Sequence, residues 1–334
     1  MRKNLLFFFV LLSGISFSTF SESLKDSALT LLVRQDYAGA NACIQKHLLK
    51  NPDDNTALYF KLAIEQTRIL DYESYLIDGE KFIVMVDSIK SVLESRLKKL
   101  RGADSLECLF FIANAYGGIS IIQAKAGNWF DAMRNAVNST GMLKQVRKQD
   151  PEFYAAYLGI GVFNYYLRNS LKWVPFVDDK GEEGIRAIEN AMKADFPYNY
   201  AAKNSLCWIL IEKDKFRSAD SLAISVLKDI PDNTIFLRIR TFIALWTGKN
   251  KEAIELAKRL IVLSEKRNPM NWSDLIAGYT VLVNSYSNLK MEKEAFDSAE
   301  EILNRQIPRE YLQIPHIKKN IRYISDKKQK ALKK

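Results

Sequence analysis

Residues 213–231, KDKFRSADSLAISVLKDIP, carry the pattern that decides the fold. Within this stretch Ala219, Ala223 and Val226 are separated by four and three positions, which places all three on one face of an α-helix. Pro231 ends the helix, because proline cannot donate a backbone hydrogen bond. The stretch therefore predicts an amphipathic helix that packs through small and apolar side chains.

The same spacing occurs six times in the chain, with His47 as the one residue that is neither apolar nor small. The six triads are Ala40/Ile44/His47, Ala132/Ala136/Ser139, Gly184/Ile188/Ala191, Ala219/Ala223/Val226, Ala253/Ala257/Leu260 and Ala295/Ala299/Ile302. Other amphipathic stretches lie between them, such as 199–212, 233–246 and 274–289. The predicted unit is therefore a helix, a short turn, a second helix and a break.

This combination resembles the tetratricopeptide repeat, whose period is about 34 residues. The matching phrases are QDYAGANACIQKHLLKNP (35–52), GNWFDAMRNAV (127–137), the opening stretch, GKNKEAIELAKRLI (248–261) and MEKEAFDSAEEIL (291–303). The step from Ala219 to Ala253 is 34 residues, whereas that from Ala132 to Gly184 is 52. DPEFYAAYLGIGVFNYY (150–166) with GEEGIRAIENAMKADFP (181–197) also looks like a variant in bacterial envelope repeat proteins.

The resemblance implies an all-α fold, a right-handed α-solenoid of stacked helical hairpins with no sheet. One hairpin cannot bury its apolar face alone, so neighbours stack and present a concave surface. We expect residues 1–21 to be a signal peptide and residues 22–317 to be the repeat domain. The repeats should be irregular at 53–102, with one diverged unit near Ile83, and more regular at 181–307. Residues 318–334 form a basic tail that caps the repeats and then becomes disordered.

The N-terminus has the pattern of a secretory signal. Arg2 and Lys3 precede the apolar run Leu5–Leu12, and the small-residue stretch Ser13–Ser21 follows. Cleavage after Ser18 or Ser21 fits this pattern, and an uncleaved anchor is the alternative. We expect no later segment to cross a membrane. The expected location is the periplasm or the outer envelope of a bacterium.

Most of the positive charge lies at the two ends of the chain. The net charge is +10 over 334 residues, of which residues 318–334 contribute +7 and Arg2 with Lys3 contribute +2. The remaining +1 argues against a broad nucleic-acid surface. The basic side chains at the very end have two interpretations, a solvated terminus or weak contact with anionic lipid head groups; they are Lys327, Lys328, Lys330, Lys333 and Lys334.

Residues for catalysis or metal binding are scarce. The chain has two histidines, and it lacks the phosphate-loop, nucleophile-elbow and HExxH motifs. Cys43 and His47 share a helix face but supply only two ligands, so we expect no metal and no cofactor. We expect Cys43, Cys108 and Cys207 to be buried thiols, with one disulfide and a leftover thiol as the alternative. The acidic pairs Asp178-Asp179 and Glu182-Glu183 are expected to begin the helix at Gly181.

Two groups of residues have both a structural and a functional interpretation. Gly117, Gly118, Gly159 and Gly161 lie inside apolar helices, where close helix–helix approach is favoured over ligand contact. The connection 169–180 contains Leu171, Trp173, Val174, Pro175, Phe176 and Val177. It either caps the core of the repeats or binds a partner.

Two hypotheses for function follow. The favoured one is a non-catalytic envelope scaffold that binds a protein or peptide, with partner-binding residues Trp173, Phe176, Tyr165 and Tyr166. The alternative is a small-ligand-binding or hydrolytic envelope protein, in which Tyr165, Tyr166 and Trp208 line an aromatic pocket. Ordinary helix packing is the structural interpretation of those three rings.

Overall fold

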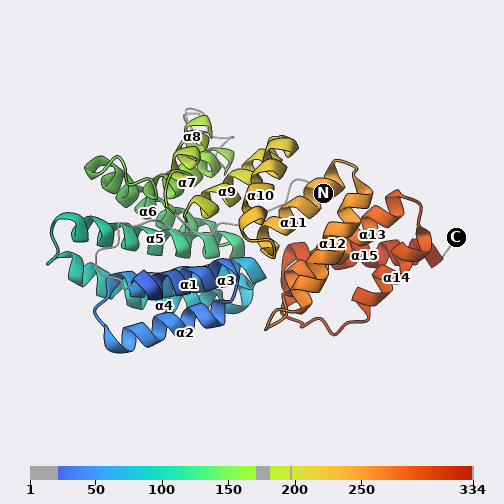
Figure 1. The fold of residues 1–334 in the computed structure, drawn as a ribbon, viewed down its shortest axis with the longest axis horizontal. Coiled ribbons are helices and arrows are strands. Elements are labelled where there is room, and N and C mark those ends of the chain that lie inside the picture. The colour runs from blue at the N-terminus through green and yellow to red at the C-terminus, as the bar shows by residue number, and fades with distance from the viewer. Residues whose placement is uncertain (1–21, 171–180, 196–197, 333–334) are drawn as a thin grey trace. The chain divides into compact units, whose positions relative to one another are not determined.

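The computed structural model describes residues 22–170, 181–195 and 198–332. This part of the chain forms fifteen α-helices and one 3₁₀ helix, and it contains no strand. The predicted all-α fold class without a sheet is confirmed. Figure 1 shows the helices in chain order, from α1 in blue to α15 in red.

The helices are α1 (Glu22–Val33), α2 (Tyr37–Lys50), α3 (Asn55–Tyr72), α4 (Tyr75–Leu97), α5 (Gly102–Ala126), α6 (Trp129–Gln149), α7 (Ala156–Ser170), α8 (Gly181–Ala191), α9 (Tyr198–Glu212), α10 (Phe216–Asp229), α11 (Thr234–Trp246), α12 (Asn250–Glu265), α13 (Trp272–Asn288), α14 (Glu292–Leu303), the 3₁₀ helix η2 (Tyr311–Gln313) and α15 (Pro315–Leu332).

The described residues divide into two compact units. Unit 1 contains the short segment Asp71–Ile77 and the chain from Cys207 onward, and unit 2 contains the rest. In unit 2, α5 packs on α6, α6 on α7 and α7 on α8. In unit 1, neighbouring helices from α10 to α15 pack on one another in the same way. Each unit is thus built from consecutive antiparallel hairpins.

The small-residue positions lie where the repeat pattern predicts. Ala40, Ala219 and Ala253 are fully buried, and the residues four positions later are buried as well except for Ala136. His47 is half-buried, and its Nε2 lies 2.8 Å from the Asp54 carboxylate. Because the small side chains bring helices close together, the pattern specifies packing between the helices of a hairpin.

The turns inside the hairpins share one backbone geometry. In each turn that the structure describes, the residue five positions before the first small residue of the following triad has a positive φ. These residues are Gln35, Gly127, Asp214, Gly248 and Lys290. The next amide donates to a carbonyl five residues earlier, as Met291 N does to Tyr286 O at 2.9 Å. This left-handed residue and its bond satisfy carbonyls that the helix end would leave unpaired.

The irregular first half of the chain has longer helices. α4, α5 and α6 have 23, 25 and 21 residues, whereas α10 has 14 and α12 has 16. The extra turns lengthen the sequence step between hairpins. Near Ile83, where one diverged unit was expected, Ile83 is half-buried and its neighbours Phe82 and Val86 are buried, and the division into repeat units there stays a prediction.

Glycines inside helices mark close approach, as expected. A Cβ on Gly161 would lie 2.6 Å from the Gly184 carbonyl oxygen, and one on Gly184 would lie 2.7 Å from the Gly161 carbonyl oxygen. A Cβ on Gly118 would lie 2.8 Å from Gln66 Oε1. The backbones of α7 and α8 are therefore in contact where both residues lack a side chain.

The cysteines are free thiols. Cys108 and Cys207 are buried, which confirms the buried-thiol interpretation for these two residues, whereas Cys43 is half-buried. Cys207 Sγ donates to the Ala219 carbonyl at 3.5 Å. The Cys207 side chain thus fills the space beside a small-residue position on the paired helix.

Two elements differ from the sequence expectations. α5 is long and apolar enough to cross a membrane, contrary to what we expected of later segments, but 61% of its apolar window is buried in the protein, as for a core helix. α15 continues through Leu332, so the chain from Lys327 to that residue is helical. Ile317 and Ile324 are buried, and Lys328 pairs with Glu300 at 3.0 Å.

Candidate functional site

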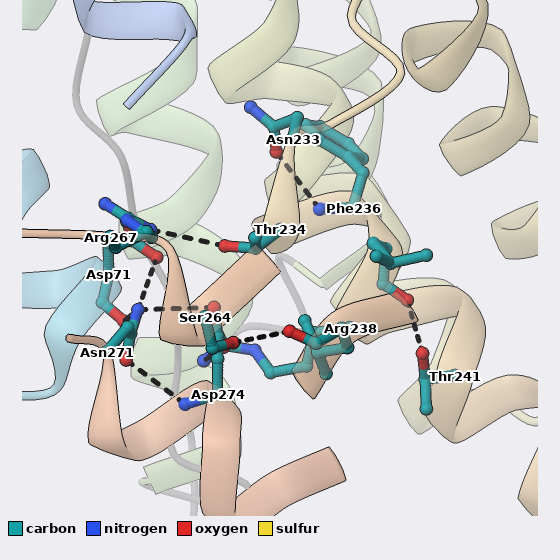
Figure 2. Close-up of polar contacts among 12 residues, drawn as sticks. Asp71, Asn233, Thr234, Phe236, Arg238, Thr241, Ser264, Arg267, Asn271 and Asp274 are labelled. Atoms are coloured by element: carbon teal, nitrogen blue, oxygen red, sulfur yellow. Dashed lines mark hydrogen bonds and ion pairs between the residues drawn. The ribbon is translucent and has the colours of Figure 1, made fainter. Parts of the chain in front are cut away.

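Unit 1 contains a buried network of charged and amide side chains. Figure 2 shows it between the C-terminal end of α3, the start of α11 and the connection from α12 to α13. Arg267 Nη1 lies 2.6 Å from Asp71 Oδ2, and Arg238 Nη1 lies 2.7 Å from Asp274 Oδ1. Asn271 Nδ2 donates to Asp274 Oδ2 at 3.2 Å and to the Asp71 carbonyl at 3.3 Å.

The local structure positions each member of the network. Asn271 is the N-cap of α13, and its Oδ1 accepts from the Asp274 amide at 3.1 Å. The backbone N–H of Asn271 donates in turn to the Ser264 carbonyl at the end of α12. The Arg267 guanidinium lies 4.6 Å from the centre of the Tyr72 ring, and the Tyr72 hydroxyl donates to the Pro269 carbonyl.

Both carboxylates of this network are closed to solvent, with side-chain exposures of 0%. Burial raises the pKa of Asp274 to about 6; Arg238 opposes the shift and Asp71 adds to it. The two arginines and Asn271 contact both of these carboxylates. The network therefore holds the segment Asp71–Ile77 in unit 1 and does not form an open binding site.

Unit 2 contains a cluster of aromatic rings beside a carboxyl group with a shifted pKa. Tyr59 on α3 stacks on Phe111 of α5 at 4.5 Å, and Phe110 lies 4.9 Å from Phe153. Glu107 is one turn before Phe111. Burial, with Asp104 and Asp54, raises the pKa of Glu107 to about 7.

Tyr198 at the start of α9 belongs to the same surroundings. Its ring is buried, and within the described part of the chain its hydroxyl has no hydrogen-bond partner. Burial, followed by Tyr59 and Glu107, raises the pKa of Tyr198 well above its usual value. Shifted titratable groups beside one another are a feature of functional sites, although buried packing also produces them.

Two half-buried tyrosines lie next to this cluster, at the start of α7. The rings of Tyr154 and Tyr157 are 6.3 Å apart. The Arg147 guanidinium lies 5.6 Å from the Tyr157 ring, and the Lys193 ammonium lies 5.6 Å from the Tyr154 ring. We call these four residues the tyrosine surface. It presents two half-buried aromatic rings and two cations, the Tyr157 hydroxyl donates to the Pro151 carbonyl at 3.0 Å, and Phe153 connects the surface to the buried rings.

The residues proposed from sequence are placed as follows. Tyr165 is buried and Tyr166 is half-buried, with their rings perpendicular at 4.8 Å. Trp208 is buried in unit 1. Trp173, Phe176 and the pair Asp178-Asp179 lie outside the described residues, and Glu182 and Glu183 occupy the first turn of α8. Among the described residues no cluster of three or more potential metal ligands is present.

Sequence reasoning missed both the buried network and the tyrosine surface. A usable signal for the network was present in α11, TIFLRIRTFIALW, where Arg238 interrupts a helix that is apolar on nearly every side. A buried arginine requires a paired carboxylate. The tyrosine surface had no signal of its own, because nothing in DPEFYAAY separates half-buried rings from buried ones.

Comparison with known proteins identifies the fold. No family model matches the sequence, and no curated protein is similar to it. The crystal structure of the APC/C hetero-tetramer Cut9–Hcn1 contains a similar chain, with a TM-score of 0.58 and 16% identity over 93% of this protein and 56% of that chain. This protein thus spans just over half the length of that relative.

A tetratricopeptide repeat protein from Parabacteroides merdae ATCC 43184 is also similar, with a TM-score of 0.42 and 11% identity over 91% of this chain and 98% of that one. The match to the Cut9–Hcn1 structure carries the assignment. The protein therefore has the tetratricopeptide-repeat fold that the sequence resemblance implied.

Proposed function

We propose that this protein is an exported, non-catalytic scaffold that binds a protein or peptide partner in the bacterial cell envelope. The repeat fold supports the binding role, because stacked hairpins expose long surfaces that suit extended partners. The basic, apolar and small-residue pattern of residues 1–21 supports export. The proposed location is the periplasm or the outer envelope.

The tyrosine surface is the observation that carries the binding proposal. Tyrosine and arginine are enriched among residues that dominate interface energies, and here they lie on adjoining elements of unit 2. Arg147 and Lys193 would attract carboxylates of the partner, while Tyr154 and Tyr157 would supply contact area. Tyr165 is too buried to contact a partner directly, so we propose that it supports Tyr166 by packing.

Affinity capture with matched variants tests this proposal. Tagged wild-type protein, the double variant Tyr154→Ala/Tyr157→Ala and the control Tyr311→Ala would be incubated with envelope extract, and captured proteins identified by mass spectrometry. Tyr311 is a half-buried tyrosine of unit 1. We expect the double variant to lose a partner that the wild type and the control retain, with unchanged helical content. Equal capture by all three would refute the assignment to this surface.

Tyr198 and Glu107 favour the alternative of a small-ligand site enough to justify a direct test. If the buried hydroxyl contacts a ligand, Tyr198→Phe should abolish ligand-induced stabilisation and leave the free protein nearly unchanged. If the ring only packs, the same variant should stabilise the free protein, because it removes a buried hydroxyl that has no hydrogen-bond partner within the described chain. Thermal melting of both proteins against a metabolite library separates these outcomes.

A further inference from the structure

The outward face of α6 carries large apolar side chains that are exposed to solvent. Phe130 is 96% exposed, Trp129 54% and Val137 53%, so three of the nine large exposed hydrophobic side chains lie within nine residues. Large apolar residues that gather in this way mark an interaction surface, whereas single ones are ordinary. Residues 127–131, which span the turn before α6 and its first three residues, are all exposed.

The same face carries positive charge. Helical spacing places a row of side chains on one side of α6, namely Phe130, Arg134, Val137, Gly141, Lys144 and Lys148. All six are exposed. The acidic side chain beside the row is Asp131, which pairs with Arg134 at 2.9 Å. The row is therefore apolar at its N-terminal end and cationic toward its C-terminal end.

The opposite side of α6 is fixed in unit 2. Ala132, Leu143 and Val146 are buried, and Ser139 is buried between them. The helix thus presents its outward face without any rearrangement of the fold. Gly141 is also exposed, and a Cβ placed on it would have no atom within 4 Å. No internal packing at this position accounts for the glycine, unlike the contact of Gly161 with Gly184.

We propose that the outward face of α6 binds the surface of an anionic phospholipid membrane. Trp129 and Phe130 would enter the boundary between head groups and acyl chains, where aromatic rings are favoured. Arg134, Lys144 and Lys148 would contact lipid phosphates, as basic side chains of surface-lying amphipathic helices do. The charge complementarity selects an anionic surface over a neutral one.

A bilayer fits this face better than an acidic protein does. Phe130 is almost completely exposed, and a membrane accepts such a ring without a preformed pocket. The cations extend along the helix for about 20 Å, which matches a planar array of phosphates. The inference is independent of the tyrosine surface, so either can fail without the other.

Vesicle co-sedimentation tests the proposal. The chain from Glu22 onward is used, because the apolar run Leu5–Leu12 would bind lipid by itself. We expect binding to vesicles of equal parts phosphatidylcholine and phosphatidylglycerol, weak binding to phosphatidylcholine alone, and loss of binding in high salt. Trp129→Ala/Phe130→Ala should weaken binding about tenfold or more. Arg134→Gln/Lys144→Gln/Lys148→Gln should weaken it about 100-fold.

Two controls make the test specific. Val84→Ala removes an exposed apolar side chain of α4 and should leave vesicle binding unchanged. A variant with the five terminal lysines changed to glutamine should retain most of the binding. If that variant loses binding while the α6 variants keep it, the tail is the membrane contact and the proposal is wrong. Absence of vesicle binding by the wild type, or loss of an acidic protein partner in the α6 variants instead, would also overturn it.

Discussion

Arg267 contacts Asp71 across 196 residues of sequence, with Nη1 2.6 Å from Oδ2. This ion pair joins the connection before α13 to the last turn of α3, inside unit 1. Exposed ion pairs contribute little to stability, but a buried charge that loses its partner is costly. The segment Asp71–Ile77 is therefore held by this buried ion pair together with the burial of the Tyr72 and Tyr75 rings.

Asp71→Ala should lower the free energy of unfolding of unit 1 by about 3–5 kcal/mol, because it leaves the Arg267 guanidinium buried without its carboxylate. The loss can be measured by urea denaturation, with hydrogen exchange of α11 and α13 amides to locate it. Asp53→Ala is the matched control, since Asp53 is 93% exposed and pairs with Arg96 at 2.8 Å. The control should cost less than about 1 kcal/mol. Equal losses would show that burial does not strengthen the Asp71 pair.

Stability should depend on pH through Glu107. Its pKa is raised from 4.5 to about 7 by burial, so the folded state favours the protonated form. The stabilising contribution is fully present below pH 4.5 and is lost as the pH rises through about 7. Above pH 7 the ionised Glu107 should lower the free energy of unfolding by about 2 kcal/mol, a figure reduced for partial solvent screening. Glu107→Gln should therefore restore this free energy above pH 7.

Urea denaturation at several pH values checks the Glu107 prediction. Asp104→Asn removes a like charge and should shift the Glu107 transition to lower pH without abolishing it. Glu152→Gln, at an exposed carboxylate, should leave the pH profile unchanged. A profile that Glu107→Gln does not alter would mean that this carboxyl titrates normally in the folded protein.

Two glycines should respond in opposite ways to the same substitution. Gly161→Ala should destabilise unit 2 by about 2–3 kcal/mol, because the added Cβ meets the Gly184 carbonyl at 2.6 Å and backbone cannot move aside easily. Gly141→Ala should stabilise the protein by about 1 kcal/mol, since the site is open and alanine is the better helix former. Thermal melting of the two variants is sufficient; a stabilised Gly161→Ala variant would contradict the close approach of α7 and α8.

The sequence allowed prediction of what depends on local periodicity. Ala219 and Ala253 are buried because a spacing of four and seven residues places side chains on one helix face, whatever the rest of the chain does. The lengths of α4 to α6 were harder to predict, because without regular steps nothing marked where a hairpin ended. The Asp71–Arg267 pair was beyond reach, since its partners are chosen by tertiary structure and neither residue has a distinctive local pattern.

The turn residues with left-handed backbone were also only partly predictable from the local sequence. Gly127 and Gly248 are recognisable turn residues, but Lys290 and Asp214 occupy the same position without glycine. Their conformation follows from the hairpin geometry and not from their own preference. Only alignment of the repeats on their small residues identifies these positions from sequence.

Lys290→Gly should stabilise unit 1 by about 0.5–1 kcal/mol. Lys290 has a φ of 59°, and a left-handed conformation costs a residue with a Cβ about 1 kcal/mol or more relative to glycine. Part of the gain is offset by the greater backbone entropy of glycine in the unfolded chain. The matched reverse change is Gly248→Ala, at the equivalent turn with φ 75°, which should destabilise by about 1 kcal/mol. The prediction fails if chemical denaturation gives both variants a change of the same sign.

The last prediction concerns Trp173 and Phe176, which lie outside the described residues and whose role stays a prediction. If this connection caps the core of the repeats, each truncation to alanine should cost about 3 kcal/mol or more. If it binds a partner, the double variant should lose the partner and melt nearly as the wild type does. We expect the first result, because an exposed apolar connection of this length would promote aggregation whenever the partner was absent.

The pair Trp129 and Phe130 provides a matched control for this experiment. It has the same two ring types, and both rings are exposed at the start of α6. Trp129→Ala/Phe130→Ala should therefore change the melting temperature little, whereas Trp173→Ala/Phe176→Ala should lower it strongly. Melting and partner capture would be measured on the same preparations. A stable Trp173/Phe176 double variant that no longer captures the partner would contradict the capping role and assign the connection to binding.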